Sequence, residues 1–369
     1  MSQPAQQIRF CTSRDGTRIA YATCGAGPPL VCVAGWTRHL ELDWDSPVYR
    51  PWLSLLTRRH TLTRYDMRGC GLSDREGVEF SFEKLIEDFE AVIEATGLEQ
   101  FVLFGSTPGA AIGMTYAVRH PERVSRLVLY AGYVRNRLAS TPTPQQMEEA
   151  QARLKVIELG WPNDTPAYGQ FYASLHIPDA SAGQFQSFTD LVRRTTSPAN
   201  AAALLQVFYR IDVREIVPRV RCPTLVLHPR GDSIIPFEQG RLVAGLIPGG
   251  RFVPLESRNH ILLETEPAWQ QFVEALDDFL PAAPTKPAGL GGTPLDQLTT
   301  REHEVLELVA QGLDNDAIGK QLHISKHTAR NHVSAVLGKL GINSRAQAIV
   351  QAREAGFGRR NSPAESGKS

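Results

Sequence analysis

The sequence predicts an α/β domain with a mostly parallel sheet and a helical cap, followed by a small all-helical domain. Three observations lead to this prediction. Short apolar runs rich in β-branched residues alternate with amphipathic stretches over residues 1–280, which is typical of a buried parallel sheet. The strand rhythm stops between about 133 and 212, where only helical patterns occur. A proline- and glycine-rich linker, 281–294, then precedes further helical patterns over 295–357.

Composition excludes several classes of protein. The 369 residues carry zero formal charge, and no apolar run is long enough to cross a bilayer. The first residues, MSQPAQQIRF, lack the pattern of a secretion signal, so we expect a cytoplasmic protein without a membrane partner. The five cysteines are scattered and never spaced as C-x-x-C, so we expect no metal site and no cofactor.

The first elements are predicted to be a β-hairpin and then the strands of the sheet. IRFCTS and TRIAYATCG flank the turn residues Arg14 to Gly16, which indicates the hairpin. An amphipathic helix is expected over 82–95. Four apolar runs predict buried parallel strands, at 30–33, 101–104, 127–130 and 224–227.

The predicted cap is rich in aromatic residues. Their side chains either line a ligand pocket beneath the cap or form the core of the cap itself, and composition favours the core. The aromatic residues are Trp161, Phe171, Tyr172, Phe185, Phe188, Phe208 and Tyr209.

The stretch LFGSTPGAAIG, residues 103–113, has the spacing of a nucleophile on a tight strand-to-helix turn. Such a turn needs small residues two positions before and after the nucleophile. Gly105 and Gly109 occupy those positions around Thr107. Were Ser106 the nucleophile, Phe104 and Pro108 would stand where bulk is least tolerated.

Residues 1–280 resemble the α/β-hydrolase family. The resemblance rests on VAGW (33–36), RYDMRGCGLSD (64–74), the elbow, HPERVSRLVL (120–129), GDSIIP (231–236) and NH (259–260). It implies a triad of Thr107, Asp232 and His260, in the family order of nucleophile, acid and base. The alternative for Asp232 and His260 is a buried polar pair that holds a loop.

Two departures from the family pattern argue against turnover. Threonine is β-branched and resists the positive φ that the elbow demands. Pro108 stands where the family uses a backbone N–H as an oxyanion-hole donor, and proline has none. By family position, Trp36 supplies the other donor. We therefore expect a binding pocket for a small, mostly apolar ligand, lined by Gly35, Trp36, Ser106, Thr107, Pro108 and His260.

The C-terminal helices predict a helix-turn-helix unit with a basic recognition helix. Thr299 and Glu302 form a capping box, Gly312 ends the first helix, and Ser325 caps the third. Residues 320–360 carry eight lysines or arginines against one acid, Glu354, whereas residues 294–319 carry six acids against one arginine. This segregation favours contact with DNA phosphates.

This domain resembles the LuxR-type helix-turn-helix family over nearly all of 295–357. The matching segments are LTTREHEVL, Gly312 to Asn315, IS-x-x-TARNHV and KLGINSRAQA. The resemblance implies contacts with base edges from Arg330, Asn331 and Ser334. It implies contacts with phosphates from Lys326, Thr328 and Lys339. The alternative is a helix-turn-helix used only for protein contacts.

The resemblance also implies a homodimer on double-stranded DNA. The fourth helix, 344–355, is the dimer surface of the family, and its apolar residues either serve that contact or pack within the domain. Those residues are Ala346, Ala348, Ile349, Val350 and Ala352. The tail, 358–369, is expected to be disordered.

Three functions remain open from the sequence. The leading hypothesis is a ligand-responsive transcriptional regulator, a pseudoenzyme whose hydrolase-like domain senses a small molecule with little or no turnover. The alternative is an active ester or lactone hydrolase fused to a DNA-binding domain. The third is a structural adaptor whose pocket is filled by its own side chains.

Overall fold

The computed structural model divides the chain into two compact units, Met1–Pro284 and Thr285–Ser369. It describes residues 6–33, 35–139, 141–160, 166–280, 300–322, 326–340, 342, 344–355 and 357–358. The predicted linker, Thr299, Ser325, Trp161 and all but the first residue of the predicted tail lie outside these ranges. Each unit is described by itself below.

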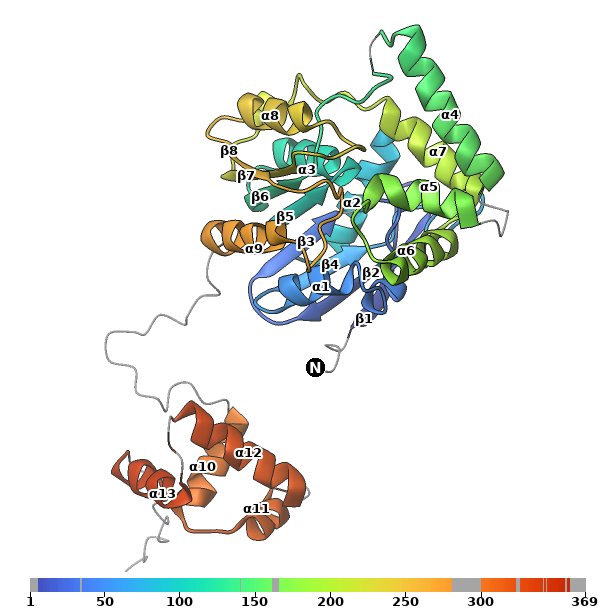
Figure 1. The fold of residues 1–369 in the computed structure, drawn as a ribbon. Coiled ribbons are helices and arrows are strands. Elements are labelled where there is room, and N and C mark those ends of the chain that lie inside the picture. The colour runs from blue at the N-terminus through green and yellow to red at the C-terminus, as the bar shows by residue number, and fades with distance from the viewer. Residues whose placement is uncertain are drawn as a thin grey trace, which may run out of the picture. The chain divides into compact units, whose positions relative to one another are not determined.

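Within the described residues of the first unit, eight strands form a single sheet (Figure 1). The strands are β1 (Gln7–Thr12), β2 (Arg18–Gly25), β3 (Pro29–Val33), β4 (Thr61–Tyr65), β5 (Phe101–Ser106), β6 (Val124–Tyr130), β7 (Thr224–Pro229) and β8 (Arg251–Leu255). Their spatial order is β1-β2-β4-β3-β5-β6-β7-β8. The pairs β1–β2 and β2–β4 are antiparallel, and all the others are parallel. The predicted hairpin and the predicted parallel sheet are both confirmed.

Helices cover both faces of the sheet. The helices α1 (Arg50–Thr57) and α9 (Pro267–Phe279) share one face, where the rings of Trp52 and Phe272 lie 4.7 Å apart. The helices α2 (Phe82–Thr96), α3 (Pro108–Arg119) and α8 (Phe237–Leu246) cover the other face. Strands β3, β5 and β7 are buried almost throughout, because both of their faces are covered. Short 3₁₀ turns, η1 (Leu42–Trp44) and η2 (Val217–Arg219), lie in the connections.

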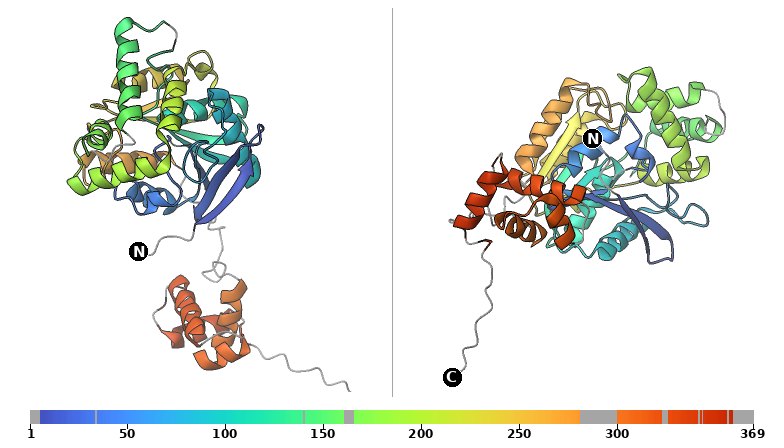
Figure 2. Two further views of the ribbon diagram at one scale, coloured as in Figure 1. Left: turned by 90° about the vertical axis from the view of Figure 1, so that its right-hand side faces the viewer. Right: turned by 90° about the horizontal axis from the view of Figure 1, so that it is seen from below.

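Four helices form the cap between β6 and β7, as the sequence predicts. They are α4 (Pro144–Gly160), α5 (Pro166–His176), α6 (Ala182–Thr195) and α7 (Pro198–Tyr209). Figures 1 and 2 show them gathered to one side of the sheet as a separate group. They pack mainly on one another, α5 on α6 and α4 on α7. The α/β-hydrolase fold with a helical cap is therefore confirmed.

The loop RYDMRGCGLSD is held by its own backbone and side chains. The Ser73 hydroxyl donates to the Asp66 carbonyl at 2.6 Å and accepts from the Ala20 N–H at 2.9 Å. Asp74 accepts from the Arg18 N–H at 2.8 Å. These bonds fasten the loop to β2, and they give Ser73 and Asp74 a structural role.

The second unit contains four helices in its described residues. They are α10 (Thr300–Ala310), α11 (Asn315–Gln321), α12 (Lys326–Lys339) and α13 (Arg345–Glu354). On α12, Ala329, Val333, Val336 and the following Leu340 are buried, as the helical spacing predicts. Asp314 caps α11 by accepting from the N–H of Asp316 and of Ala317. The predicted all-α helix-turn-helix domain is confirmed.

No helix in the described part of the chain combines the length and the apolar character that crossing a membrane requires. All five cysteines are free thiols, three of them buried. Among the described residues, no cluster of three or more His, Cys, Asp or Glu side chains is arranged to hold a metal ion.

Candidate functional site

Thr107 occupies a sharp elbow between β5 and α3. Its backbone has φ = 53° and ψ = −114°, a left-handed conformation that a β-branched residue rarely adopts. The flanking glycines permit the turn, because a Cβ at Gly105 would lie 2.6 Å from the Gly109 carbonyl oxygen. A Cβ at Gly109 would collide with the carbonyl oxygen of Val33. The elbow geometry that the G-x-T-x-G spacing predicts is therefore present despite the threonine.

The three residues predicted as a triad are hydrogen-bonded in series. The Thr107 Oγ1 and the His260 Nε2 lie 2.8 Å apart, and the His260 Nδ1 lies 2.7 Å from the Asp232 Oδ2. An ionised Asp232 accepts the proton of Nδ1, so Nε2 keeps the lone pair that accepts from the threonine hydroxyl. This arrangement is able to remove a proton from Thr107.

Asp232 is held as an anion by its surroundings. Burial by itself would raise the pKa of this carboxyl, but the charge and the hydrogen bond of His260 outweigh burial and keep the pKa below its ordinary value. The N–H groups of Ile234 and Ile235 also donate to the Oδ1, at 2.8 and 3.1 Å. The alternative interpretation of a loop-holding pair is also consistent with these two backbone bonds.

The corner beside the nucleophile lacks the expected donor. Pro108 begins α3 and has no N–H, and its Cδ stands on the nitrogen where the hydrogen would be. The pyrrolidine ring faces the turn after β3, since a Cβ at Gly35 would lie 3.7 Å from that Cδ. The Thr107 N–H is bonded to the Tyr130 carbonyl at 3.0 Å and is not available either. An oxyanion formed at Thr107 would therefore meet a carbon atom at this corner.

The loop after β3 is fixed by a buried ionic network. Asp43 is fully buried and accepts from Arg38 at 2.8 Å and from Arg64 at 2.7 Å. Burial alone would lower the pKa of Arg38, but Asp43 raises it above its ordinary value. The guanidinium of Arg38 lies 4.0 Å from the ring centre of Tyr49, whose hydroxyl bonds Thr37. The wall that carries Trp36 is thus rigid.

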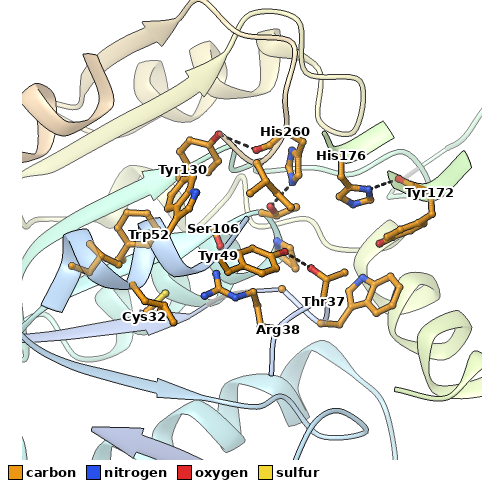
Figure 3. A pocket seen from close by; sticks show the side chains of 18 residues that line it. Cys32, Thr37, Arg38, Tyr49, Trp52, Ser106, Tyr130, Tyr172, His176 and His260 are labelled. Atoms are coloured by element: carbon orange, nitrogen blue, oxygen red, sulfur yellow. Dashed lines mark hydrogen bonds between the residues drawn. The ribbon is translucent and has the colours of Figure 1, made fainter. Parts of the chain in front are cut away.

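A cavity of about 70 Å³ lies over the elbow (Figure 3). All six residues predicted to bind a ligand line it: Gly35, Trp36, Ser106, Thr107, Pro108 and His260. Their roles in binding remain a prediction. Tyr172, one of the predicted cap aromatics, also lines the cavity, and the structure adds side chains that sequence reasoning missed: Arg38, Tyr49, Trp52, Tyr130 and His176. The strand of Tyr130 and the helical cap that carries His176 were predicted, but no local motif marks any of these residues as part of a site.

His176, at the end of α5, is brought against the triad by the cap. Its Nδ1 donates to the Tyr172 carbonyl at 2.9 Å, and its ring lies 5.5 Å from that of His260 (Figure 3). Burial, and then the charge of His260, lower the pKa of His176 to about 3. It is therefore a neutral imidazole, whose Nε2 is a hydrogen-bond acceptor at the cavity wall.

A second cavity, of about 90 Å³, adjoins the first beneath the cap. The two share five lining residues: Trp36, Thr107, Pro108, Tyr172 and His176. Four of the cap aromatics line the second cavity, namely Phe171, Tyr172, Phe208 and Tyr209. Phe188 is instead fully buried, and Phe185 packs against the core. Some cap aromatics thus line the cavity and others form the core, with Phe208 doing both, and a ligand in that cavity remains a prediction.

Helix α12 carries the six residues predicted to contact DNA. The side chains of Lys326 and Arg330 are exposed, whereas Ala329 and Val333 are buried. The side chains of Thr328, Asn331, Ser334 and Lys339 lie outside the described part of the structure. Arg345 links α13 to the start of α11 by donating to Asn315 at 2.9 Å and to the Leu313 carbonyl.

The fourth helix has a divided apolar surface. Ala348 and Ala352 are buried in the domain core, and Ile349 packs against it. Ala346 and Val350 are exposed, and 57% of Val350 is accessible. Packing within the domain thus explains part of the predicted dimer surface, and one exposed apolar pair is left.

The comparisons with known proteins match both units. A family model described as alpha/beta hydrolase fold matches residues 28–267, and one described as bacterial regulatory proteins, luxR family, matches residues 296–352. The pyrrolizixenacetamide deacetylase of Xenorhabdus hominickii is 25% identical over 263 residues, 71% of this chain and 94% of that protein.

Solved structures share the fold of the first unit. A hydrolase from Pseudomonas aeruginosa PA01 has a TM-score of 0.62 and 23% identity, and it covers 75% of this chain and 99% of its own. The esterase EaEST from Exiguobacterium antarcticum has a TM-score of 0.63 and 22% identity, covering 74% and 99%. The chain belongs to the α/β-hydrolase fold family and carries a C-terminal DNA-binding domain of the bacterial LuxR family.

Proposed function

We propose that this DNA-binding regulator responds to a small ligand held by its hydrolase domain, and that this domain turns the ligand over little or not at all. The observation that carries the proposal is Pro108, whose ring replaces a transition-state donor while the adjacent pocket remains open. A single oxyanion-hole donor contributes about 3 to 4 kcal/mol to an acyl-transfer transition state. Losing it slows turnover by about two to three orders of magnitude and leaves ground-state binding intact.

The ligand in this proposal is small and mostly apolar in its body. The two cavities are walled mainly by aromatic and aliphatic side chains, and the polar groups at the elbow end that can fix orientation include the Thr107 hydroxyl and the imidazoles of His176 and His260. The cavities also argue against the adaptor hypothesis, in which the protein's own side chains fill the pocket. Ligand occupancy would then bias how the LuxR-type domains engage DNA in the cytoplasm.

DNA binding as a homodimer is part of the proposal. The support is the exposed Ala346 and Val350, which lie four residues apart and so on one face of α13. Exposed Lys326 and Arg330 on α12 support the assignment of that helix to the major groove. The remaining assigned side chains keep their roles as predictions from the family resemblance.

An active hydrolase is the second candidate, and one observation favours it. Thr107, His260 and Asp232 form an unbroken relay at 2.8 and 2.7 Å. A purely structural histidine has no need of a bond to the hydroxyl at the elbow. The relay can activate the nucleophile, and the defect at Pro108 concerns the charge that develops on the substrate oxygen during attack, not the removal of the proton.

Ester hydrolysis separates the two candidates. 4-Nitrophenyl acetate and 4-nitrophenyl butyrate would be assayed with the wild-type protein and with His260→Ala, at matched concentrations. We expect equal rates, because the intact relay leads to no stabilised oxyanion. Multiple turnovers that disappear in His260→Ala would overturn the sensor proposal and establish the hydrolase.

DNA-binding measurements test the part of the proposal that concerns transcriptional regulation. Sites would be selected from random double-stranded DNA with the full-length protein, and affinity would then be measured on the selected site and on a scrambled duplex. We expect a preference for the selected site that falls with salt. Equal affinity for both duplexes would contradict sequence-specific regulation.

A further inference from the structure

The cap cavity has an electrostatic feature that a site for a purely apolar ligand does not need. Two arginines, Arg137 and Arg153, line it from the segment after β6 and from α4. No aspartate or glutamate is among the described residues that line this cavity or its neighbour. Two cations thus face a mostly apolar chamber whose wall provides no anion.

Arg137 is only partly satisfied by the protein. Its side chain is 16% exposed, and its one ion pair in the described residues is with the half-exposed Glu149, at 3.6 Å. Its Nε is buried and has no hydrogen-bond partner. A buried guanidinium donor without an acceptor costs roughly 1 to 3 kcal/mol, so an acceptor that entered the cavity would bind favourably there.

Arg153 acts on the same space. Burial raises the pKa of Tyr209, and the charges of Arg153 and Arg137 both oppose that rise. The Arg137 guanidinium lies 5.5 Å from the ring centre of Tyr209. Burial, and then repulsion by Arg153, lower the pKa of Arg137. The two cations therefore lie around one aromatic ring and repel each other, which a bound anion would relieve.

The opposite end of this space is the elbow. Thr107, Pro108, Trp36 and His176 line both cavities, so a ligand that begins at the arginines can extend to the triad. The chamber between is lined by apolar side chains such as Ile157, Leu205 and Phe208. An elongated amphipathic molecule fits this order of surfaces, with its charge under the cap.

We infer that the ligand is an amphipathic carboxylate, whose anionic group pairs with Arg137 and Arg153 and whose apolar body lies toward Thr107. The inference rests on the proposed function, and it adds the chemical class of the ligand. Planar guanidinium groups match a carboxylate with two parallel hydrogen bonds, which sets this class apart from neutral esters and alcohols. The carboxylate would pair with Arg137 either beside Glu149 or in place of it.

Matched pairs of probes test this in the full-length protein. The probes are 3-phenylpropionate and octanoate, each beside its neutral amide, with dissociation constants from calorimetry at pH 7. We expect each carboxylate to bind at least about tenfold more tightly than its amide, the ratio that one charge-assisted hydrogen bond provides. An amide that binds as tightly as its acid, or no binding by either carboxylate, would overturn the inference.

Variants then locate the anion. Arg137→Gln and Arg153→Gln are each expected to reduce the preference for the carboxylate about tenfold, to near unity. Lys155→Gln is the matched control, because Lys155 is on α4 but 70% exposed and paired with Glu158. Arg137→Lys retains the charge and tests folding if Arg137→Gln proves unstable. A preference that survives in both glutamine variants would contradict the assignment.

The same samples distinguish this inference from the proposed function. Arginine-dependent carboxylate binding that leaves affinity for the selected DNA site unchanged would overturn the sensor proposal and leave the ligand class standing. A DNA response to the neutral amides, with no response to the carboxylates, would support a sensor and overturn the ligand class. Turnover of a 4-nitrophenyl ester would test the sensor proposal only, because it does not depend on carboxylate binding at Arg137 or Arg153.

Discussion

The Oγ1 of Thr107 and the Nε2 of His260 lie 2.8 Å apart, although 153 residues separate them in the chain. Directly after Thr107 comes Pro108, which cannot donate a hydrogen bond to any oxyanion that Thr107 would form. The site therefore combines a complete proton relay with an incomplete transition-state pocket. Activation of the nucleophile and stabilisation of the oxyanion are therefore separate properties of this site, and each can be tested alone.

Restoring the missing donor should create turnover. Pro108→Ala supplies an N–H at the first position of α3, and we expect hydrolysis of 4-nitrophenyl acetate to rise by about a hundredfold or more over the wild type. The double variant with His260→Ala is the control, and it should return the rate to the background. An unchanged rate in Pro108→Ala would show that the proline is not what limits the chemistry.

Two glycines of α3, Gly109 at the elbow and Gly113 beyond it, should differ sharply in their tolerance of a methyl group. Gly109→Ala forces a Cβ into the Val33 carbonyl oxygen, so we expect a loss of about 3 kcal/mol or more of unfolding free energy. Gly113→Ala, one turn later on α3, meets only side-chain atoms, of Leu103 at 3.2 Å and of Leu127 at 3.7 Å, and should change stability by less than about 1 kcal/mol. Urea unfolding would measure both, and equal losses would contradict the elbow packing.

The neutral His176 should make the first unit sensitive to acid. Its pKa is about 3 when folded, against an ordinary 6.5, so the unfolded chain binds more protons between these values. The folded state is therefore most stable above pH 6.5, and the contribution of the neutral His176 to stability is lost as the pH falls from 6.5 toward 3. Between pH 7 and pH 5 the free energy of unfolding should fall by about 2 kcal/mol more in the wild type than in His176→Phe. The phenylalanine keeps a ring at this position but does not titrate.

Tryptophan fluorescence is a suitable measurement for this difference. All five tryptophans lie within residues 1–280, so the signal reports unfolding of that unit. Other histidines with lowered pKa values, such as His228, are present in both proteins and cancel in the comparison. Parallel stability curves for the wild type and His176→Phe would contradict the prediction.

Arg330 should contact base edges and so contribute to sequence specificity, whereas Lys326 should contact only the phosphates. Arg330→Ala is expected to cost about 1 to 3 kcal/mol on the selected site and much less on random duplex. Lys326→Ala should weaken binding to both duplexes equally and reduce the salt dependence by about one ion. Gel-shift titrations on the two duplexes would decide, and an equal loss for Arg330→Ala on both would limit it to phosphate contact.

Val350 should support the dimer. Val350→Glu places a charge on the exposed apolar pair of α13, so we expect dissociation to monomers and weaker binding to a paired half-site. Val350→Thr keeps the branched shape of the side chain and adds no charge, so it should weaken the dimer much less. Analytical ultracentrifugation would measure both, and an unchanged mass for Val350→Glu would remove α13 from the interface.

The sequence by itself determined the two folds, the elbow and the order of Thr107, Asp232 and His260. These features are local in the sequence: strand periodicity, glycines spaced around a turn, and polar residues in the loops that follow strands. The loss of the donor at Pro108 is also local, because it follows from the covalent structure of proline.

Only the tertiary structure decided what faces the elbow. His176, Arg137 and Arg153 belong to cap segments that have no motif of their own, and their place around the same cavity as Thr107 depends on how those segments pack over the sheet. The tertiary structure also decided which cap aromatics line a cavity and which fill the core, because composition is the same in both cases. Packing between segments distant in sequence is a property of shape and burial, and these arise only once the chain is folded.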